Sequence, residues 1–112
     1  MFQFAEFTIL GYVGKVTITG NVMRLNIGAT KSWKDRETGQ RNEKTKWNTV
    51  TVFENNPGFS WLKDNLKKGD LAHVRGEMEN TSYDRAGETV YDVSLIADTV
   101  AVIPTGKHAG GE

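Results

Sequence analysis

The chain has 112 residues, no cysteine, and a net charge of zero from 14 basic and 14 acidic side chains. This length suits one domain with one hydrophobic core, and the lack of cysteine excludes a disulfide framework and a thiolate metal site. A neutral chain is also a poor candidate for coating a polyanion through bulk charge alone. No apolar stretch approaches the roughly 18 residues that cross a bilayer, and no basic residue lies near the N-terminus, so we expect a cytoplasmic protein without a membrane segment.

The first part of the chain predicts two strands. Residues 7–19 are mainly β-branched or aromatic and include Gly11 and Gly14, so we expect a long strand that bends at a glycine. Apolar and polar residues then alternate through residues 23–30, the period of a strand with one face on a core. The apolar residues of this second strand are Met23, Leu25, Ile27 and Ala29.

A polar hairpin and a third strand follow. Residues 34–43 contain no apolar residue and have Gly39 near their centre, which predicts an exposed hairpin tip. In a strand over residues 44–53, Val50 and Val52 share one face, whereas Trp47 and Phe53 share the other. Because the chain is too short to cover that second face with another layer, we expect the two aromatic residues to be exposed.

The hairpin is also the most basic part of the chain. Between Lys31 and Trp47 there are six basic and three acidic residues, a net charge of +3, so the remainder of the chain carries −3. On charge alone, an ordinary solvated surface is the favoured interpretation. The tryptophans in this stretch, Trp33 and Trp47, favour a binding surface instead.

One helix and two more strands complete the pattern. Residues 57–68 predict a helix, with Phe59, Leu62 and Leu66 on its core face and Gly69 after its end. We attribute Trp61 to helix packing as well. Strands are expected over residues 71–78 and 90–95, with a polar loop at 80–88 between them, and the glycine-rich residues 104–112 predict a flexible tail after a domain of residues 1–103.

This order of elements predicts an all-β fold. Five antiparallel strands with one short helix between strands 3 and 4 form the layout of an OB-fold barrel, in which strands 2 and 3 and the loops usually form the binding surface.

Several segments resemble the bacterial and phage single-stranded DNA-binding protein family. They are residues 14–21, 31–39, 45–53, 67–70 and 74–76, and the resemblance extends over residues 14–103. It implies sequence-tolerant binding of single-stranded DNA in support of replication, recombination or repair. Such binding requires flat aromatic side chains on which bases stack, with cations alongside for the phosphates.

The resemblance also implies roles for individual residues. Bases are expected to stack on Trp33, Trp47, Phe53 and Tyr83. Phosphate contacts are expected from the cations that neighbour these aromatics in the sequence, Lys31, Lys34, Arg36, Arg41, Lys44, Lys46 and Arg85, and, on the resemblance alone, from Lys15. Trp33 has the same parity as the core residues of strand 2, so its exposure requires a twist, a bulge, or a strand that projects past the barrel rim.

The sequence departs from the family at two places. Members usually have a longer insertion between strands 1 and 2, and they usually end in a long linker with an acidic tip; the chain has neither. We therefore expect no recruitment of repair proteins through an acidic tail. The resemblance still implies a homo-oligomer, a dimer or a tetramer, because strand edges such as that of strand 1 need a partner.

The sequence also bears on two other classes of function. We expect no enzymatic activity, cofactor or metal, because the histidines are only His73 and His108, no carboxylate cluster has metal-ligand spacing, and the serines lack a nucleophile elbow. The alternative is an OB-fold protein-interaction module, such as a primosomal replication accessory protein, in which the exposed aromatics anchor a partner.

Overall fold

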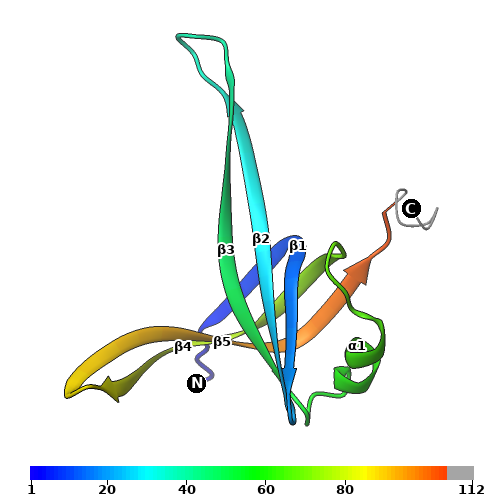
Figure 1. Ribbon diagram of the computed structural model, residues 1–112, viewed down its shortest axis with the longest axis vertical. Helices are drawn as coiled ribbons and strands as arrows, with labels where there is room; N and C mark the ends of the chain where they lie inside the picture. Colours follow the sequence, from blue (N-terminus) through cyan, green and yellow to red (C-terminus); the bar gives the residue numbers. More distant parts are fainter. Residues whose placement is uncertain (106–112) are drawn as a thin grey trace.

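The computed structural model describes residues 1–105, so residues 106–112 of the expected tail lie outside the described residues. Its elements are β1 (Glu6–Thr19), β2 (Val22–Lys34), β3 (Arg41–Phe53), α1 (Phe59–Asn65), β4 (Leu71–Arg85) and β5 (Glu88–Ile103) (Figure 1). The strands form a closed barrel in the order β1-β2-β3-β5-β4. The predicted five-stranded OB-fold with a helix between β3 and β4 is therefore confirmed.

β1 is bent and serves two neighbours. Its first half, Glu6 to Tyr12, pairs with β4, and its second half, Tyr12 to Thr19, pairs with β2. The register with β2 shifts between Val13 and Lys15, at Gly14, which confirms the predicted bend at a glycine. Each half of β1 therefore has one strand partner within the chain, and half of each edge of the strand is unpaired.

The barrel closes through one parallel pair. β3 and β5 run parallel and meet at Thr51 and Ile96, whereas the other four strand pairs are antiparallel. The prediction of a wholly antiparallel barrel is wrong at this pair. A ring of five strands cannot alternate direction at every step, so one neighbouring pair must be parallel.

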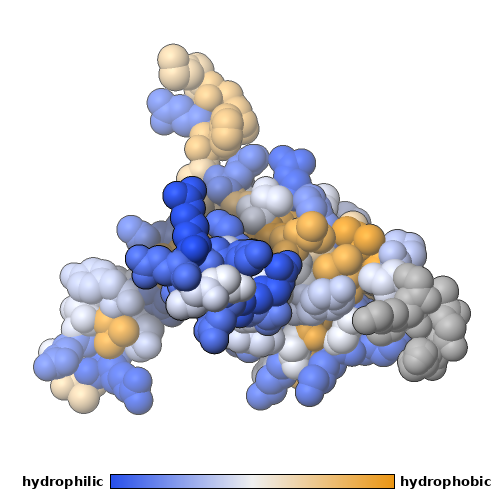
Figure 2. Space-filling view, turned by 90° about the horizontal axis from the view of Figure 1, so that it is seen from above, coloured by the Kyte–Doolittle hydropathy of each residue, from blue (hydrophilic) through white to orange (hydrophobic). Residues whose placement is uncertain are grey.

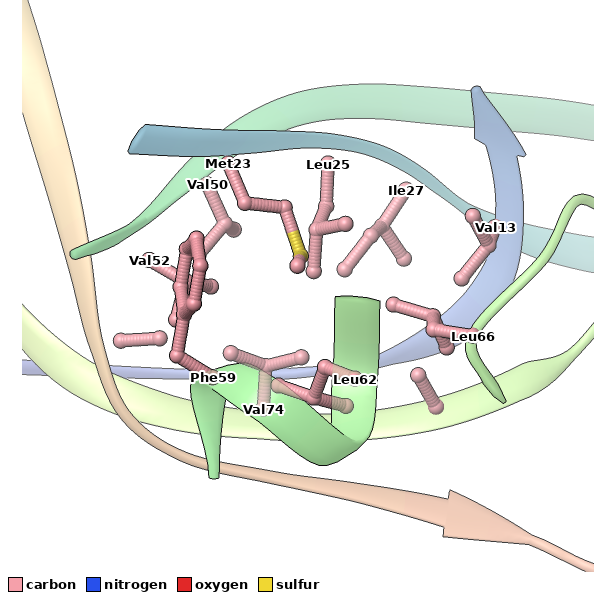
Figure 3. Close-up of a cluster of buried hydrophobic side chains, with 12 residues drawn as sticks. Val13, Met23, Leu25, Ile27, Val50, Val52, Phe59, Leu62, Leu66 and Val74 are labelled. Atoms are coloured by element: carbon pink, nitrogen blue, oxygen red, sulfur yellow. The ribbon is translucent and has the colours of Figure 1, made fainter. Parts of the chain in front are cut away.

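The core lies inside the barrel and under α1. Met23, Leu25 and Ile27 of β2 and Val50 and Val52 of β3 are fully buried, as their alternation predicts. Figure 3 shows these side chains pointing toward one another. The helix covers this core with Phe59, Leu62 and Leu66, which are also buried. The alternating and helical patterns of the sequence thus identified the core of the barrel.

The helix is shorter than expected, and one of its aromatics is not buried. α1 ends at Asn65, because Leu66 already has an extended backbone conformation. Trp61 is 55% exposed, so its assignment to helix packing is wrong; it lies off the buried stripe of the helix.

Two hairpins extend beyond the core as arms. We define the β2–β3 arm as residues 29–46 and the β4–β5 arm as residues 77–96. Both are regular ladders, and none of their residues is buried. In Figure 1 the β2–β3 arm projects upward and the β4–β5 arm projects to the left, so their tips lie far apart.

The β4–β5 arm corrects the prediction of a polar loop over residues 80–88. β4 and β5 pair continuously to Arg85 and Glu88, and only Ala86 and Gly87, both with positive φ, form the turn. Since both faces of this arm meet solvent, its sequence lacks the alternation that marks a strand on a core. Within residues 1–105, the helix is too short and too polar to span a membrane.

Candidate nucleic-acid interface

The outer face of β1, β2 and β3 carries two of the aromatic residues selected from the sequence. Outward residues of β3 alternate with the buried Val50 and Val52, and they include Trp47 and Phe53. Trp47 is 56% exposed and Phe53 is 40% exposed. The prediction that these rings point away from the core is confirmed.

A small hollow lies on the same outer face. It has a volume of about 220 Å³ and is lined by Lys15, Thr17, Arg24, Asn26 and Thr49.

The position of the hollow brings a further cation into the site. Thr49 lies between Trp47 and Phe53 along β3, so the hollow lies between the two exposed rings, and Lys15 and Arg24 supply its positive charge. Arg24 was not selected from the sequence. The signal was present, because Arg24 has the polar parity of β2, opposite to the core residues on either side of it.

Trp33 is exposed because its strand leaves the barrel. β2 and β3 pair without a register shift from Val22–Phe53 to Lys34–Arg41, so neither a bulge nor a change of register turns the side chain outward. The strand instead projects past the rim, and Trp33 is 47% exposed near the end of the β2–β3 arm. This is one of the three arrangements that its parity required.

The two tryptophans lie on opposite faces of the hairpin. Trp33 pairs with Asn42, whereas Trp47 pairs with Gly28 and has the other parity along β3. By the same alternation, the face of Trp33 also carries Lys31, Lys44 and Lys46, and the face of Trp47 carries Lys34 and Arg41. Lys44 and Lys46 therefore lie on the face of Trp33 and not on that of Trp47, whereas the hollow places Lys15 on the outer face of the barrel that carries Trp47.

Cations oppose one another across the β2–β3 arm. Lys31 is the direct cross-strand partner of Lys44, and Lys34 is the partner of Arg41. Residues 1–105 contain one ion pair, between Arg75 and Glu6 at 3.7 Å. None of the four cations of the β2–β3 arm named above is therefore neutralised by a carboxylate. Like charges directly opposite each other destabilise a ladder. Figure 2, which looks down on the tip of this arm, shows it as strongly hydrophilic.

The tip of the arm is held by Asp35. Its Oδ1 atom accepts hydrogen bonds from the backbone N–H groups of Thr38, at 3.1 Å, and Glu37, at 2.8 Å. These bonds, that from Thr38 first, hold the pKa of the Asp35 carboxyl below its usual value. The carboxylate thus orders the turn that carries Arg36.

Tyr83 and Arg85 lie on the other arm. Tyr83 is 49% exposed within β4, not in a loop, and Arg85 pairs with Glu88 next to the turn. The β4–β5 arm has five carboxylates and Arg85 as its one basic residue, a net charge of −4. The structure therefore separates these two residues from the six cations of the β2–β3 arm.

The described residues offer little to a metal ion. Residues 1–105 contain no group of three or more histidine, aspartate or glutamate side chains placed to hold one. His73 is half-buried in β4, and His108 lies outside the described residues.

The fold and the exposed aromatic face agree with the similarities that we found to known proteins. The family described as the single-strand binding protein family matches residues 6–103. A relative described as a single-stranded DNA-binding protein, from Rhizobium meliloti (strain 1021), is 30% identical over 103 residues, with 77% of this chain covered. The chain spans 58% of the length of that relative.

Solved structures show the same fold at lower sequence identity. A Plasmodium falciparum SSB in complex with ssDNA has a TM-score of 0.71 at 17% identity, over 93% of this chain and 98% of that one. A mitochondrial single-stranded DNA binding protein from S. cerevisiae, Rim1, has a TM-score of 0.64 at 24% identity, over 94% and 100% of the two chains. Together with the match over residues 6–103, these findings show that the chain belongs to the single-strand binding protein family.

Proposed function

We propose that the chain binds single-stranded DNA without sequence preference, by base stacking and phosphate contacts, and that it acts in the cytoplasm as a binding protein and not as an enzyme. The binding unit is residues 1–103. The stacking residues are Trp33, Trp47, Phe53 and Tyr83. The phosphate contacts come from Lys15, Lys31, Lys34, Arg36, Arg41, Lys44, Lys46 and Arg85, to which the structure adds Arg24 as a candidate.

The observation that carries this proposal is the outer face of the barrel. Trp47 and Phe53 expose their rings there, and the hollow between them contains Lys15 and Arg24. A single strand presents base faces and phosphates at alternating positions, so a surface that alternates rings and cations suits it. Stacking contributes about 1–3 kcal/mol per base and tolerates any base, because every base has a π-face.

The cation pairs of the β2–β3 arm support the same function. The free hairpin is weakened by two cross-strand pairs of like charge, Lys31 with Lys44 and Lys34 with Arg41. A bound phosphate backbone neutralises such pairs, so the repulsion is relieved only in the complex. The regular structure of the arm is thus compatible with a role in binding a polyanion.

A titration tests the proposal. We expect an oligothymidylate to quench the tryptophan fluorescence of the chain, and a duplex of the same length to bind more weakly. Affinity should fall with salt by a log–log slope of about −0.7 per neutralised phosphate on a single strand. Because the net charge is zero, the slope should be no steeper than about −5.

The same titration can contradict the proposal. Equal affinity for duplex and single strand would remove the role of base stacking. No quenching by any oligonucleotide would favour the protein-interaction module instead. A slope steeper than the limit above would show that phosphate contacts, and not stacking, supply most of the affinity.

We also propose that the protein is a homo-oligomer, a dimer or a tetramer. Leu10 and Tyr12 are each 54% exposed on the outer face of β1. Their cross-strand partners in β4, His73 and Leu71, are partly buried and lie on the same face. This apolar patch supports contact with a second copy of the chain.

A further inference from the structure

We propose that Gly14 and Gly28 are positioning residues that make room on the barrel for the far edge of the Trp47 indole, so that the ring is held in one orientation for a base. This inference rests on the proposed function, since it concerns how Trp47 presents its ring. It assigns a role in binding to two residues that have no side chain with which to touch DNA.

The geometry of the indole carries the inference. A Cβ atom added to Gly14 would lie 2.6 Å from Cζ3 and 2.9 Å from Cη2 of Trp47. A Cβ atom added to Gly28 would lie 2.8 Å and 2.9 Å from the same two atoms. The six-membered part of the ring therefore extends from β3 across β2 to β1, and it occupies space that any other residue at these two positions would fill.

The backbone does not require glycine at either position. Neither Gly14 nor Gly28 has a positive φ, unlike Gly20, Gly39, Gly69 and Gly87. For Gly14, the next nearest atom is the carbonyl oxygen of Asn26, at the ordinary contact distance of 3.6 Å. The clash that alanine would create at Gly14 is thus with the Trp47 ring alone.

The contact fixes the orientation of the ring. The atoms nearest to both glycine positions are Cζ3 and Cη2, the edge of the ring farthest from the backbone of Trp47, and the residue remains 56% exposed. A ring held in this way is already in its bound orientation, so binding does not have to immobilise it.

Alanine substitutions test the inference. We expect Gly14→Ala to tilt the indole off the sheet and to weaken binding of an oligothymidylate about fivefold or more, the loss that corresponds to a weakened stack. Gly28→Ala should have the same effect from the neighbouring strand, and its Cβ atom would in addition lie 3.0 Å from Cγ2 of Thr45, so Gly14→Ala is the cleaner test. Gly58→Ala is the matched control, because its nearest neighbouring atom lies 3.4 Å away and is not part of Trp47, and it should bind as the unmodified chain does.

A double-mutant cycle separates positioning from other effects. With Trp47→Ala in the background, Gly14→Ala should cause no further loss of affinity, because the ring with which it clashes is gone. Wild-type affinity for Gly14→Ala, or an equal loss in both backgrounds, would overturn the inference. If the single variants unfold, Trp47→Ala should restore folding to them, and failure to do so would also overturn it.

The outcome is separable from that of the proposed function. If the unmodified chain bound no oligonucleotide, the proposed function would fail first. If it bound, and Trp47→Ala weakened binding while Gly14→Ala and Gly28→Ala did not, then only the role of the glycines would be lost.

Discussion

At the scale of single residues, Trp47 is the side chain whose replacement is most informative. We expect Trp47→Ala to weaken single-strand binding by about 1–3 kcal/mol, from roughly fivefold to more than a hundredfold per protomer. The ring is partly covered by Gly14 and Gly28, so its loss should also lower the free energy of unfolding, by up to about 2 kcal/mol.

The comparison is with a residue of the core. Leu25 has no exposed surface, and Leu25→Ala should cost about 2–5 kcal/mol of stability. Melting temperature and oligonucleotide affinity, measured on both variants, distinguish the two roles. A stability loss at Trp47 as large as that at Leu25, or unchanged affinity in a folded Trp47→Ala variant, would remove Trp47 from the interface.

Asp35 predicts a pH dependence that is confined to the tip of the β2–β3 arm. Its pKa is lowered by the N–H groups of Thr38 and Glu37, so the ordered turn favours the carboxylate. The stabilisation is therefore fully present above the unfolded pKa, near about 4, and is lost as the pH falls through the lower folded value. The amide resonances of Glu37 and Thr38 should move only in that acidic range.

A variant provides the control for this prediction. Asp35→Ala should abolish the acidic transition of the two amides, because no carboxylate remains to accept their hydrogen bonds. A transition that persists in the variant, or one centred above the usual carboxyl pKa in the unmodified chain, would assign the turn to another cause.

At the scale of elements, the β2–β3 arm should gain stability when it loses binding. Lys31→Glu places a carboxylate opposite Lys44, which replaces a repulsive pair with an attractive one. We expect slower amide exchange in the arm, from about 0.2–1 kcal/mol of added stability, together with weaker binding to an oligonucleotide. Lys63→Glu, the same charge change on exposed α1, should alter neither.

One outcome would contradict the prediction for Lys31→Glu. If Lys31→Glu and Lys63→Glu weakened binding to the same extent, only the overall charge would matter, and the cross-strand cation pairs would have no specific part in binding.

The strands also show which parts of the fold can be predicted from the sequence. Strands that touch the core were predicted, since Met23, Leu25 and Ile27 of β2 must alternate with polar residues to bury one face. The outer half of β4 was not predicted as a strand. Residues 80–85 meet solvent on both faces, so burial does not require apolar and polar residues to alternate there. The long ladder of the β4–β5 arm is determined by strand pairing and by the turn at Ala86 and Gly87. Both leave only a weak pattern of apolar and polar residues in the sequence.

The site was predicted in part for the same reason. The exposure of Trp47 and Phe53 follows from parity with Val50 and Val52. The hollow at Arg24 depends on which strands are neighbours, and the contact of Gly14 with Trp47 spans three strands. Neither relation is encoded by spacing along the chain, so both required the barrel.

At the scale of the whole molecule, we expect an assembly larger than one chain of 12.5 kDa. The apolar patch on β1 and β4 is the surface that supports it, so Tyr12→Glu should shift the mass measured by light scattering toward that of one chain. Lys63→Glu again serves as the control. A mass of 12.5 kDa for the unmodified protein at micromolar concentration would contradict the prediction.

The opposite charges of the two arms have a consequence for how the molecule meets DNA. A neutral chain with +3 on one arm and −4 on another, projecting in different directions, has a permanent electric dipole. The field of a polyanion turns such a dipole before contact, so that the β2–β3 arm meets the DNA before the β4–β5 arm does. Screening by salt should therefore slow association more than it speeds dissociation, because orientation depends on long-range forces and stacking on short-range ones.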